Sequence, residues 1–299
     1  MTTVTRSRAD EIEAQSRRAG RPVLVGDDGS AAALNAVRWA AREAQRRDRP
    51  LRILHVDGAA NAMEGRLHAL ARRGERILER ATVVAEDVVA GVPQDQRVEI
   101  RTSVVLDRPA GRLVADAAGA DLVVLGREAM GRADRVGSVI GAVLADAACL
   151  VAVVPAGTSV GDDGAVVVGV APTTPQDVLD VAFAAAESRG VPLVAVHAWE
   201  ESVHGIDPLL EQYVAVMVDA HRTWLAGWAA RYPAVPMRSV VRRGHPSAVL
   251  LDVATTAGLV VVGPSRRRWS GGPAVGSVAR TLLREAPCPL VVVPRRRAA

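Results

Sequence analysis

The sequence predicts an α/β protein made of two duplicated, doubly wound domains, each a five-stranded parallel sheet flanked by helices. Two observations lead to this prediction. Short runs of Val and Leu alternate with longer amphipathic stretches, and the whole alternation occurs twice along the 299 residues. Strands that are apolar on both faces, with helices between them, are typical of a parallel sheet covered on both sides.

Four pairs of segments show the duplication. The matched pairs are 23–30 with 166–173, 51–56 with 193–198, 119–126 with 257–263, and 136–155 with 275–294. The offset between the copies is 143 residues at Gly26 and Gly169, and 139 residues at Pro155 and Pro294. A nearly constant offset indicates a duplicated domain of about 140 residues.

The elements of the first copy follow from local patterns. The predicted strands are 23–26, 51–56, 98–105, 121–126 and 150–155. Ser30 is a good N-cap for a helix after the first strand. From Leu67 to Val88, apolar residues recur at intervals of three and four, which predicts a long helix with one buried face. The second copy repeats this order.

Composition marks the segments outside the repeats. Residues 1–20 alternate Arg with Asp and Glu and contain no apolar stretch, which predicts a flexible N-terminal arm rather than a signal peptide. Residues 156–164 are rich in Gly, Asp and Ser, as is typical of a linker. The predicted domains are therefore 21–155 and 165–295.

Composition also excludes several classes of protein. Aromatic residues make up only 3%, too few for the stacking surfaces that bind single-stranded nucleic acid. The sequence contains no lysine, which excludes a P-loop or a Schiff-base lysine. Its 2 cysteines rule out a disulfide framework and a four-cysteine zinc site. No apolar run approaches the roughly 18 residues of a membrane span. We expect a cytoplasmic protein that binds neither nucleic acid nor membrane.

Two loops could carry a ligand, because sheets of this type bind ligands at the carboxyl ends of their strands, where strand order reverses. Asp28, after the first strand, could accept hydrogen bonds from an amino or hydroxyl group, or it could serve only the turn. After the fourth strand, each copy has a glycine-containing loop that enters a helix. Such a loop exposes N–H groups that suit a phosphate, and it also occurs as a plain connection.

Together these motifs resemble the universal stress protein family in a tandem arrangement, over about 21–155 and 165–294. That family has a G-D-G-S-like turn after strand one, a G-x2-G-x9-G-[S/T] loop after strand four and a C-P-hydrophobic final strand. The resemblance implies that the protein binds ATP or another adenine nucleotide, and that Mg²⁺ accompanies the nucleotide when it binds. It further implies that Asp28, His55 and Val56 lie on the adenine side and that the strand-four loop surrounds the phosphates.

The phosphate loop of the first copy departs from the family pattern. Gly126, Gly137 and Ser138 match the first glycine and the closing pair. Ala129 stands in place of the second glycine, two residues are missing, and Gly131 is a further glycine within the loop.

The second copy departs differently. Gly263, Gly276 and Ser277 keep the family spacing, but Arg266 replaces the second glycine. Ala171 stands where the first copy has its adenine-side Asp. The arginines that begin at Arg266 could grip phosphates or form a solvated loop. Each copy therefore keeps a different part of the family motif: the first keeps the adenine-side Asp, and the second keeps the length of the phosphate loop.

Two further matched pairs are predicted to pack rather than react. His55 and His197 end the second strand of each copy, and Cys149 and Cys288 precede the last strand. A buried cysteine behaves as a small hydrophobe. No histidine pair has the spacing of a zinc site, so we expect no metal of that type.

We expect a non-enzymatic regulatory or stress-response protein gated by an adenine nucleotide. Two alternatives stay open: an interaction or dimerisation module that has lost nucleotide binding, and a slow ATPase. The family pairs the last strands of two domains, so the resemblance implies intrachain pairing of 150–154 with 290–293. A homodimer and an unknown protein partner are further expectations.

Overall fold

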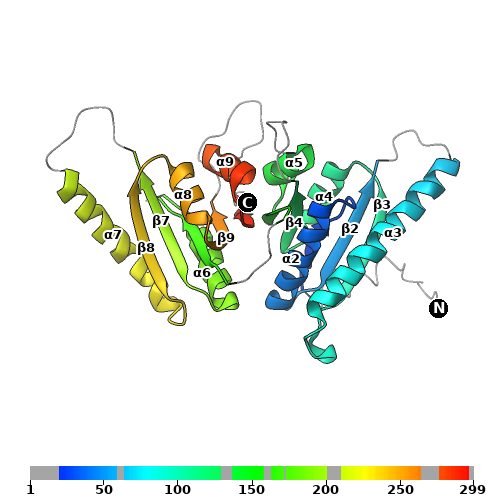
Figure 1. Cartoon of the computed structure of the whole chain (residues 1–299), viewed down its shortest axis with the longest axis horizontal. Helices are drawn as coiled ribbons and strands as arrows, with labels where there is room; N and C mark the ends of the chain where they lie inside the picture. Colours follow the sequence, from blue (N-terminus) through cyan, green and yellow to red (C-terminus); the bar gives the residue numbers. More distant parts are fainter. Residues whose placement is uncertain are drawn as a thin grey trace, which may run out of the picture.

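The computed structural model describes residues 20–58, 64–128, 137–157, 163–171, 173–200, 210–263 and 276–295 (Figure 1). The first half contains β1 Val23–Gly26, α2 Ala31–Arg47, β2 Leu51–Asp57, α3 Glu64–Val89, the 3₁₀ turn η1 Gln94–Gln96, β3 Ile100–Leu106, α4 Pro109–Ala117, β4 Leu122–Arg127, α5 Ser138–Asp146 and β5 Leu150–Pro155. The second half contains β6 Ala165–Gly169, α6 Gln176–Arg189, β7 Leu193–Trp199, α7 Leu210–Arg231, β8 Met237–Arg243, α8 Pro246–Ala254, β9 Ala257–Val262, α9 Ser277–Glu285 and β10 Leu290–Val292.

The strands form one ten-stranded sheet in the order β3-β2-β1-β4-β5-β10-β9-β6-β7-β8. Within each half all five strands run parallel. The halves join where β5 and β10 pair antiparallel, with Leu290 opposite Val153 and Val291 opposite Ala152. The α/β class, the duplication and the pairing of the two last strands are thereby confirmed.

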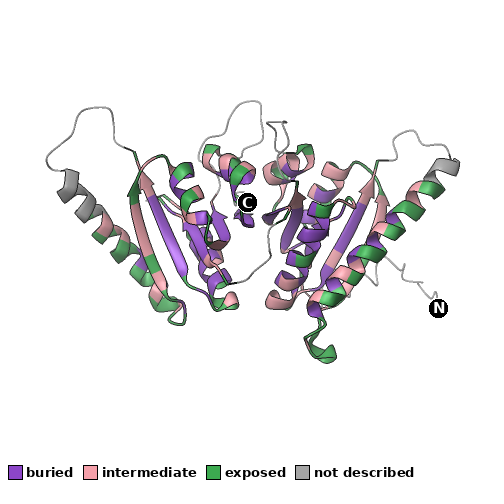
Figure 2. Cartoon of the chain, viewed as in Figure 1, coloured by how far each residue is buried: buried purple, intermediate pink, exposed green. Residues whose placement is uncertain are grey.

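Alternate residues of the strands belong to two hydrophobic cores, one on each face of the sheet. Val23 and Val25 point to the core that α2, α3, α6 and α7 cover. Leu24, between them, points to the core that α4, α5, α8 and α9 cover. Figure 2 shows the inner strands largely buried, the edge strands mainly intermediate and the outer faces of the helices exposed. This two-faced burial is the reason that the inner strands are largely apolar, whereas the edge strands β3 and β8 are only partly buried and carry Arg and Ser.

The helix α2 begins where its sequence predicts, after Ser30. The hydroxyl of Ser30 accepts a hydrogen bond from the N–H of Ala33 at 3.1 Å, which confirms Ser30 as the N-cap of α2. At the other end, Asp48 takes the left-handed conformation, and its N–H donates to the last carbonyls of the helix. This start places the turn 27–30 at the carboxyl end of β1.

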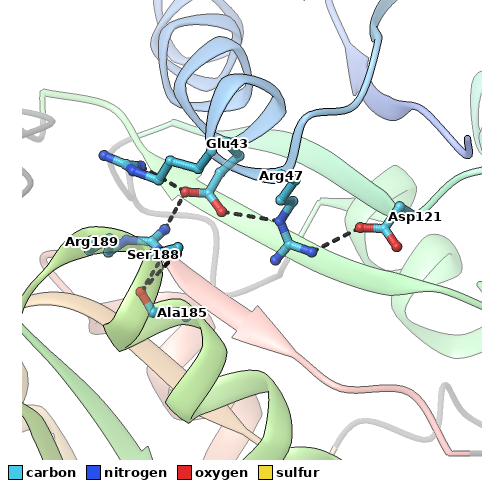
Figure 3. A network of polar contacts seen from close by, with 7 residues as sticks. Glu43, Arg47, Asp121, Ala185, Ser188 and Arg189 are labelled. Atoms are coloured by element: carbon cyan, nitrogen blue, oxygen red, sulfur yellow. Dashed lines mark hydrogen bonds and ion pairs between the residues drawn. The ribbon is translucent and has the colours of Figure 1, made fainter. Parts of the chain in front are cut away.

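A buried polar network holds the two halves together away from the strand seam (Figure 3). Glu43 on α2 is 2% exposed and receives Arg46 at 2.8 Å and Arg47 at 3.4 Å from its own helix. Arg189, at the end of α6 in the other half, also binds the Glu43 carboxylate. Arg47 extends the network to Asp121 at 2.8 Å. The carboxylate thus has several cationic partners, as a buried charge requires.

Candidate functional site

The second domain holds a pocket of about 330 Å³ at the carboxyl ends of β6, β7 and β9. Its walls are Gly169–Ala171, Thr173–Pro175, Val196, Ala198, Pro246, Leu250, Val262, Gly263 and Gly276–Ala279. β6 lies between β9 and β7 in the sheet, so the pocket sits where strand order reverses. Its volume is within the range of small-molecule sites.

The lining of this pocket is mostly apolar, with Thr173, Thr174 and Ser277 as its polar side chains. Val196, Leu250 and Val262 contribute apolar walls, which suit a ring of a ligand. Gly276 and Ser277 start α9, and therefore bring unsatisfied helix N–H groups to the rim. The described part of the lining carries no charged side chain. An aromatic ring with an attached anion fits this arrangement.

The sequence predicted Gly263, Gly276 and Ser277 for this site, and all three line the pocket. Ala171, which replaces the adenine-side carboxylate, lines it as well. Arg266 lies outside the described residues. The pocket therefore combines the intact loop spacing of the second copy with a neutral residue at the position of Asp28.

In the first domain, Asp28 is exposed, and its Oδ1 accepts the N–H of Ser30 at 3.0 Å. Gly137 and Ser138 begin α5 and are exposed. Val56 lies against the core beneath α4 and α5, on the side that corresponds to the pocket of the second domain. Ala129 and Gly131 lie outside the described residues. The described positions are thus compatible with a matching site, with Asp28 engaged in its turn.

Gly126 closes β4 against the start of α2. A Cβ at this position would lie 2.4 Å from the backbone carbonyl of Ala32, so only glycine fits. The next residue, Arg127, donates to the carbonyls of Arg284 and Ala286, both at 2.7 Å. Those carbonyls close α9, whose first turn forms the wall of the second domain's pocket. The last residue of β4 in one domain is thereby tied to the helix that lines the pocket of the other.

The two matched histidines face the other side of the sheet. His55 is buried, its Nδ1 lies 2.6 Å from the carbonyl oxygen of Asp27, and it packs near Gly74 of α3. His197 repeats the contact with the carbonyl of Val170 at 2.9 Å. In the second domain Val196 and Ala198 line the pocket, whereas His197 between them does not. His55 therefore has a packing role against α3, and its predicted place on the adenine side stays a prediction.

Sequence reasoning missed Asp27, which is 3% exposed. Burial raises the pKa of its carboxyl above the ordinary value, and the neighbouring N–H of Gly29 partly offsets this. The available signal was the repeat itself, because the second copy has Val170 at the same place. An acidic residue at a position where the other copy has valine is likewise expected to face the interior.

Two further features bear on chemistry. Burial raises the pKa of Cys149 to about 11 and that of Cys288 to about 12, so both thiols stay protonated. Among the described residues, no three His, Cys, Asp or Glu side chains lie close enough together to hold a metal ion. In that same part of the chain, no helix has the length and hydropathy to cross a bilayer.

Comparison with known proteins gives a consistent family. A model of the universal stress protein family matches residues 20–155 and 164–294. Universal stress protein Rv2005c of Mycobacterium tuberculosis is 32% identical over 287 residues, which cover 90% of this chain and 96% of that one. Rv2623 of the same organism is 34% identical over 289 residues, covering 90% and 95%. The crystal structure of a universal stress protein from Archaeoglobus fulgidus aligns with a TM-score of 0.62 at 15% identity, covering 92% of this chain and 98% of that one.

Proposed function

The chain belongs to the universal stress protein family, with two such domains in tandem, and on this premise we propose that it is a non-enzymatic regulator that binds an adenine nucleotide in its second domain. The single observation that carries the proposal is the pocket of about 330 Å³ at the switch point of β6 and β9. Its apolar walls accommodate a ring, and the first turn of α9 provides N–H groups for a phosphate.

Regulation would follow from the position of α9. A nucleotide at Gly276 and Ser277 contacts the start of this helix, whereas Arg127 of the first domain holds its end. Binding therefore acts on an element that both domains share. A ligand of this kind can favour one arrangement of the domains only as far as it binds that arrangement more tightly.

The test is nucleotide binding by paired variants of the two domains. The full chain is titrated with AMP and with ATP plus Mg²⁺ in a calorimeter. Ala198→Phe fills the pocket of the second domain, and Val56→Phe makes the corresponding change in the first. Thermal melting of each variant establishes that it is folded. We expect Ala198→Phe to abolish binding and Val56→Phe to retain it.

Other outcomes have distinct meanings. Loss of binding in Val56→Phe alone would assign the nucleotide to the first domain and overturn the placement proposed here. If the purified parent chain releases no nucleotide that mass spectrometry detects, and also binds no added nucleotide, the interaction module would be supported instead. Release of phosphate from ATP in a single-turnover assay would make the protein a slow ATPase and contradict the non-enzymatic role.

A further inference from the structure

The first domain contains a second pocket, on the opposite face of the sheet from the nucleotide side. It follows β1 and lies under α3, with a volume of about 180 Å³. Asp27, Gly29, Leu34, Arg73, Arg76, Ile77 and Arg80 line it. At about 30 Å³ for each water molecule, this volume holds roughly six waters. A ligand there must be small.

Asp27 forms the floor of this pocket, and only half of its carboxylate is used. Oδ1 accepts the N–H of Gly29 at 2.8 Å, and the backbone N–H of Asp27 donates to the carbonyl of Leu54 at 2.9 Å. Oδ2 is buried and has no hydrogen-bond partner within the described chain. A buried carboxylate oxygen without a partner is costly, so a missing donor is indicated.

Three guanidinium groups surround the opening. Arg73, Arg76 and Arg80 come from successive turns of α3, and all three are exposed. Within the described residues none of them makes a hydrogen bond or an ion pair closer than 4 Å; Arg80 acts on Asp27 only through its charge. Arginine presents several fixed donors that match carboxylate and phosphate groups. The rim is therefore suited to an anion.

The second domain provides an internal comparison. Val170 occupies the place of Asp27, because its N–H donates to the carbonyl of Val196 and its own carbonyl contacts His197. Valine there is buried without any polar requirement. The end of this strand therefore accepts an apolar residue. The turns that follow differ, because Oδ1 of Asp27 accepts the N–H of Gly29 in the first domain, whereas the Thr174 hydroxyl accepts the N–H of Ala171 in the second. The backbone contact with the neighbouring strand does not require the carboxylate, and Oδ2 of Asp27 takes no part in the turn.

From these observations we propose that the pocket under α3 binds a small hydroxylated organic anion. Its phosphate or carboxylate group contacts Arg73, Arg76 and Arg80. Its hydroxyl donates to Oδ2 of Asp27. This site is separate from the nucleotide pocket, since the two lie on opposite faces of the sheet and in different domains. Either site can fail while the other stands.

The test uses two pairs of probes that differ by hydroxyl groups. The full chain is titrated by calorimetry with malate and succinate, and with glycerol 3-phosphate and propyl phosphate. We expect one hydroxylated member to bind more tightly than its partner by about tenfold or more, as one hydrogen bond to a charged group provides. The pair that binds distinguishes a carboxylate ligand from a phosphate ligand. Saturating AMP should leave this binding unchanged.

Variants connect the binding to the named residues. Asp27→Val copies the second domain, and it should remove the preference for the hydroxylated probe while leaving the chain folded. Arg76→Ala should weaken the binding of every anion. Arg72→Ala removes an exposed arginine of the same helix that does not line the pocket, and it should change nothing. The proposal is overturned if no probe binds at millimolar concentration, or if Asp27→Val keeps the preference.

Discussion

Ala152 and Val291 lie directly opposite each other where the two halves of the sheet meet. They are also equivalent residues of the duplicated domain, because the offset between the copies is 139 at the neighbouring Pro155 and Pro294. A residue that faces its own equivalent marks the position of a twofold relation. The two domains are therefore related by an approximate dyad that passes between β5 and β10.

Leu290 tests the packing of this seam. It is 1% exposed and pairs with Val153 across the joint. Leu290→Ala should lower the free energy of unfolding by about 2–5 kcal/mol, because it leaves a cavity that the surrounding side chains fill only in part. Val83→Ala, at a position that is 65% exposed, should change the stability by less than about 0.5 kcal/mol. Urea unfolding of both variants measures the difference. Equal unfolding midpoints would contradict the close packing of Leu290 at the seam between β5 and β10.

Glu43 and Arg189 test the second contact between the halves. Each side chain is 2% exposed, so removing one partner leaves the other charge buried. Arg189→Met should therefore destabilise the chain, but by less than about 3–5 kcal/mol, the cost of an uncompensated buried charge, because Arg46 and Arg47 still pair with Glu43. The double variant Glu43→Leu with Arg189→Met should be more stable than Arg189→Met alone. A double-mutant cycle by denaturant unfolding gives the coupling energy, and additive effects would show that the two residues act independently.

Gly126 should tolerate no side chain. The Cβ of Gly126→Ala would lie 2.4 Å from the backbone of Ala32, and neither backbone can give way easily. The expected loss is about 1–3 kcal/mol, as for other overpacked sites. Gly137→Ala is the matched control, because nothing lies within 4 Å of a Cβ there. Thermal melting compares the two, and similar losses would argue against the close approach of β4 and α2.

The cysteines should be inert in the folded protein. With the pKa of Cys149 raised to about 11, only about a thousandth of this thiol is ionised near pH 8. Iodoacetamide should therefore label neither cysteine of the native chain on a timescale of minutes. In denaturant both should react readily. Labelling followed by mass spectrometry measures this, and rapid native labelling of Cys288 would indicate a redox role instead.

Asp27 should make stability depend on pH. Burial raises the pKa of Asp27 above 3.8, and the charge of Asp28 raises it further. The N–H of Gly29 and the charges of His55 and Arg80 lower it, but the net shift is upward. A raised pKa stabilises the fold at low pH, and this contribution is lost as pH rises through the folded pKa. Asp27→Val removes the effect, so its stability relative to the parent chain should increase between about pH 4 and about pH 7. The nearby Arg73 and Arg76 are unchanged by the substitution. Guanidinium unfolding at both pH values measures the trend, and a constant difference would contradict it.

Much of the fold was predictable because its cause is local. Strands such as β1 and β4 are apolar on both faces, and this pattern needs no knowledge of the partner strand. The seam between β5 and β10 was expected only through the family resemblance, since no local pattern says which edges meet.

The site was less accessible to sequence reasoning. Gly263, Gly276 and Ser277 were predicted from the loop motif of the family that the sequence resembles, but the pocket that they line depends on how α8 and α9 are spaced over the sheet. The ring of His55 lies near Gly74 of α3, a contact that strand alternation alone does not specify. The contact of Glu43 with Arg189 joins residues 146 positions apart, and only the docking of two whole domains brings them together.

The antiparallel seam has a consequence for inheritance. In a dimer of two identical subunits paired through this edge, every substitution would be present in both subunits, and dilution could separate them. Here a peptide linker keeps the partners at a fixed one-to-one ratio at any concentration. A coding change then alters one half while the other keeps its original chemistry, as Asp27 and Val170 illustrate. The two domains of the tandem chain pair as two subunits would, but each can change its sequence independently of the other.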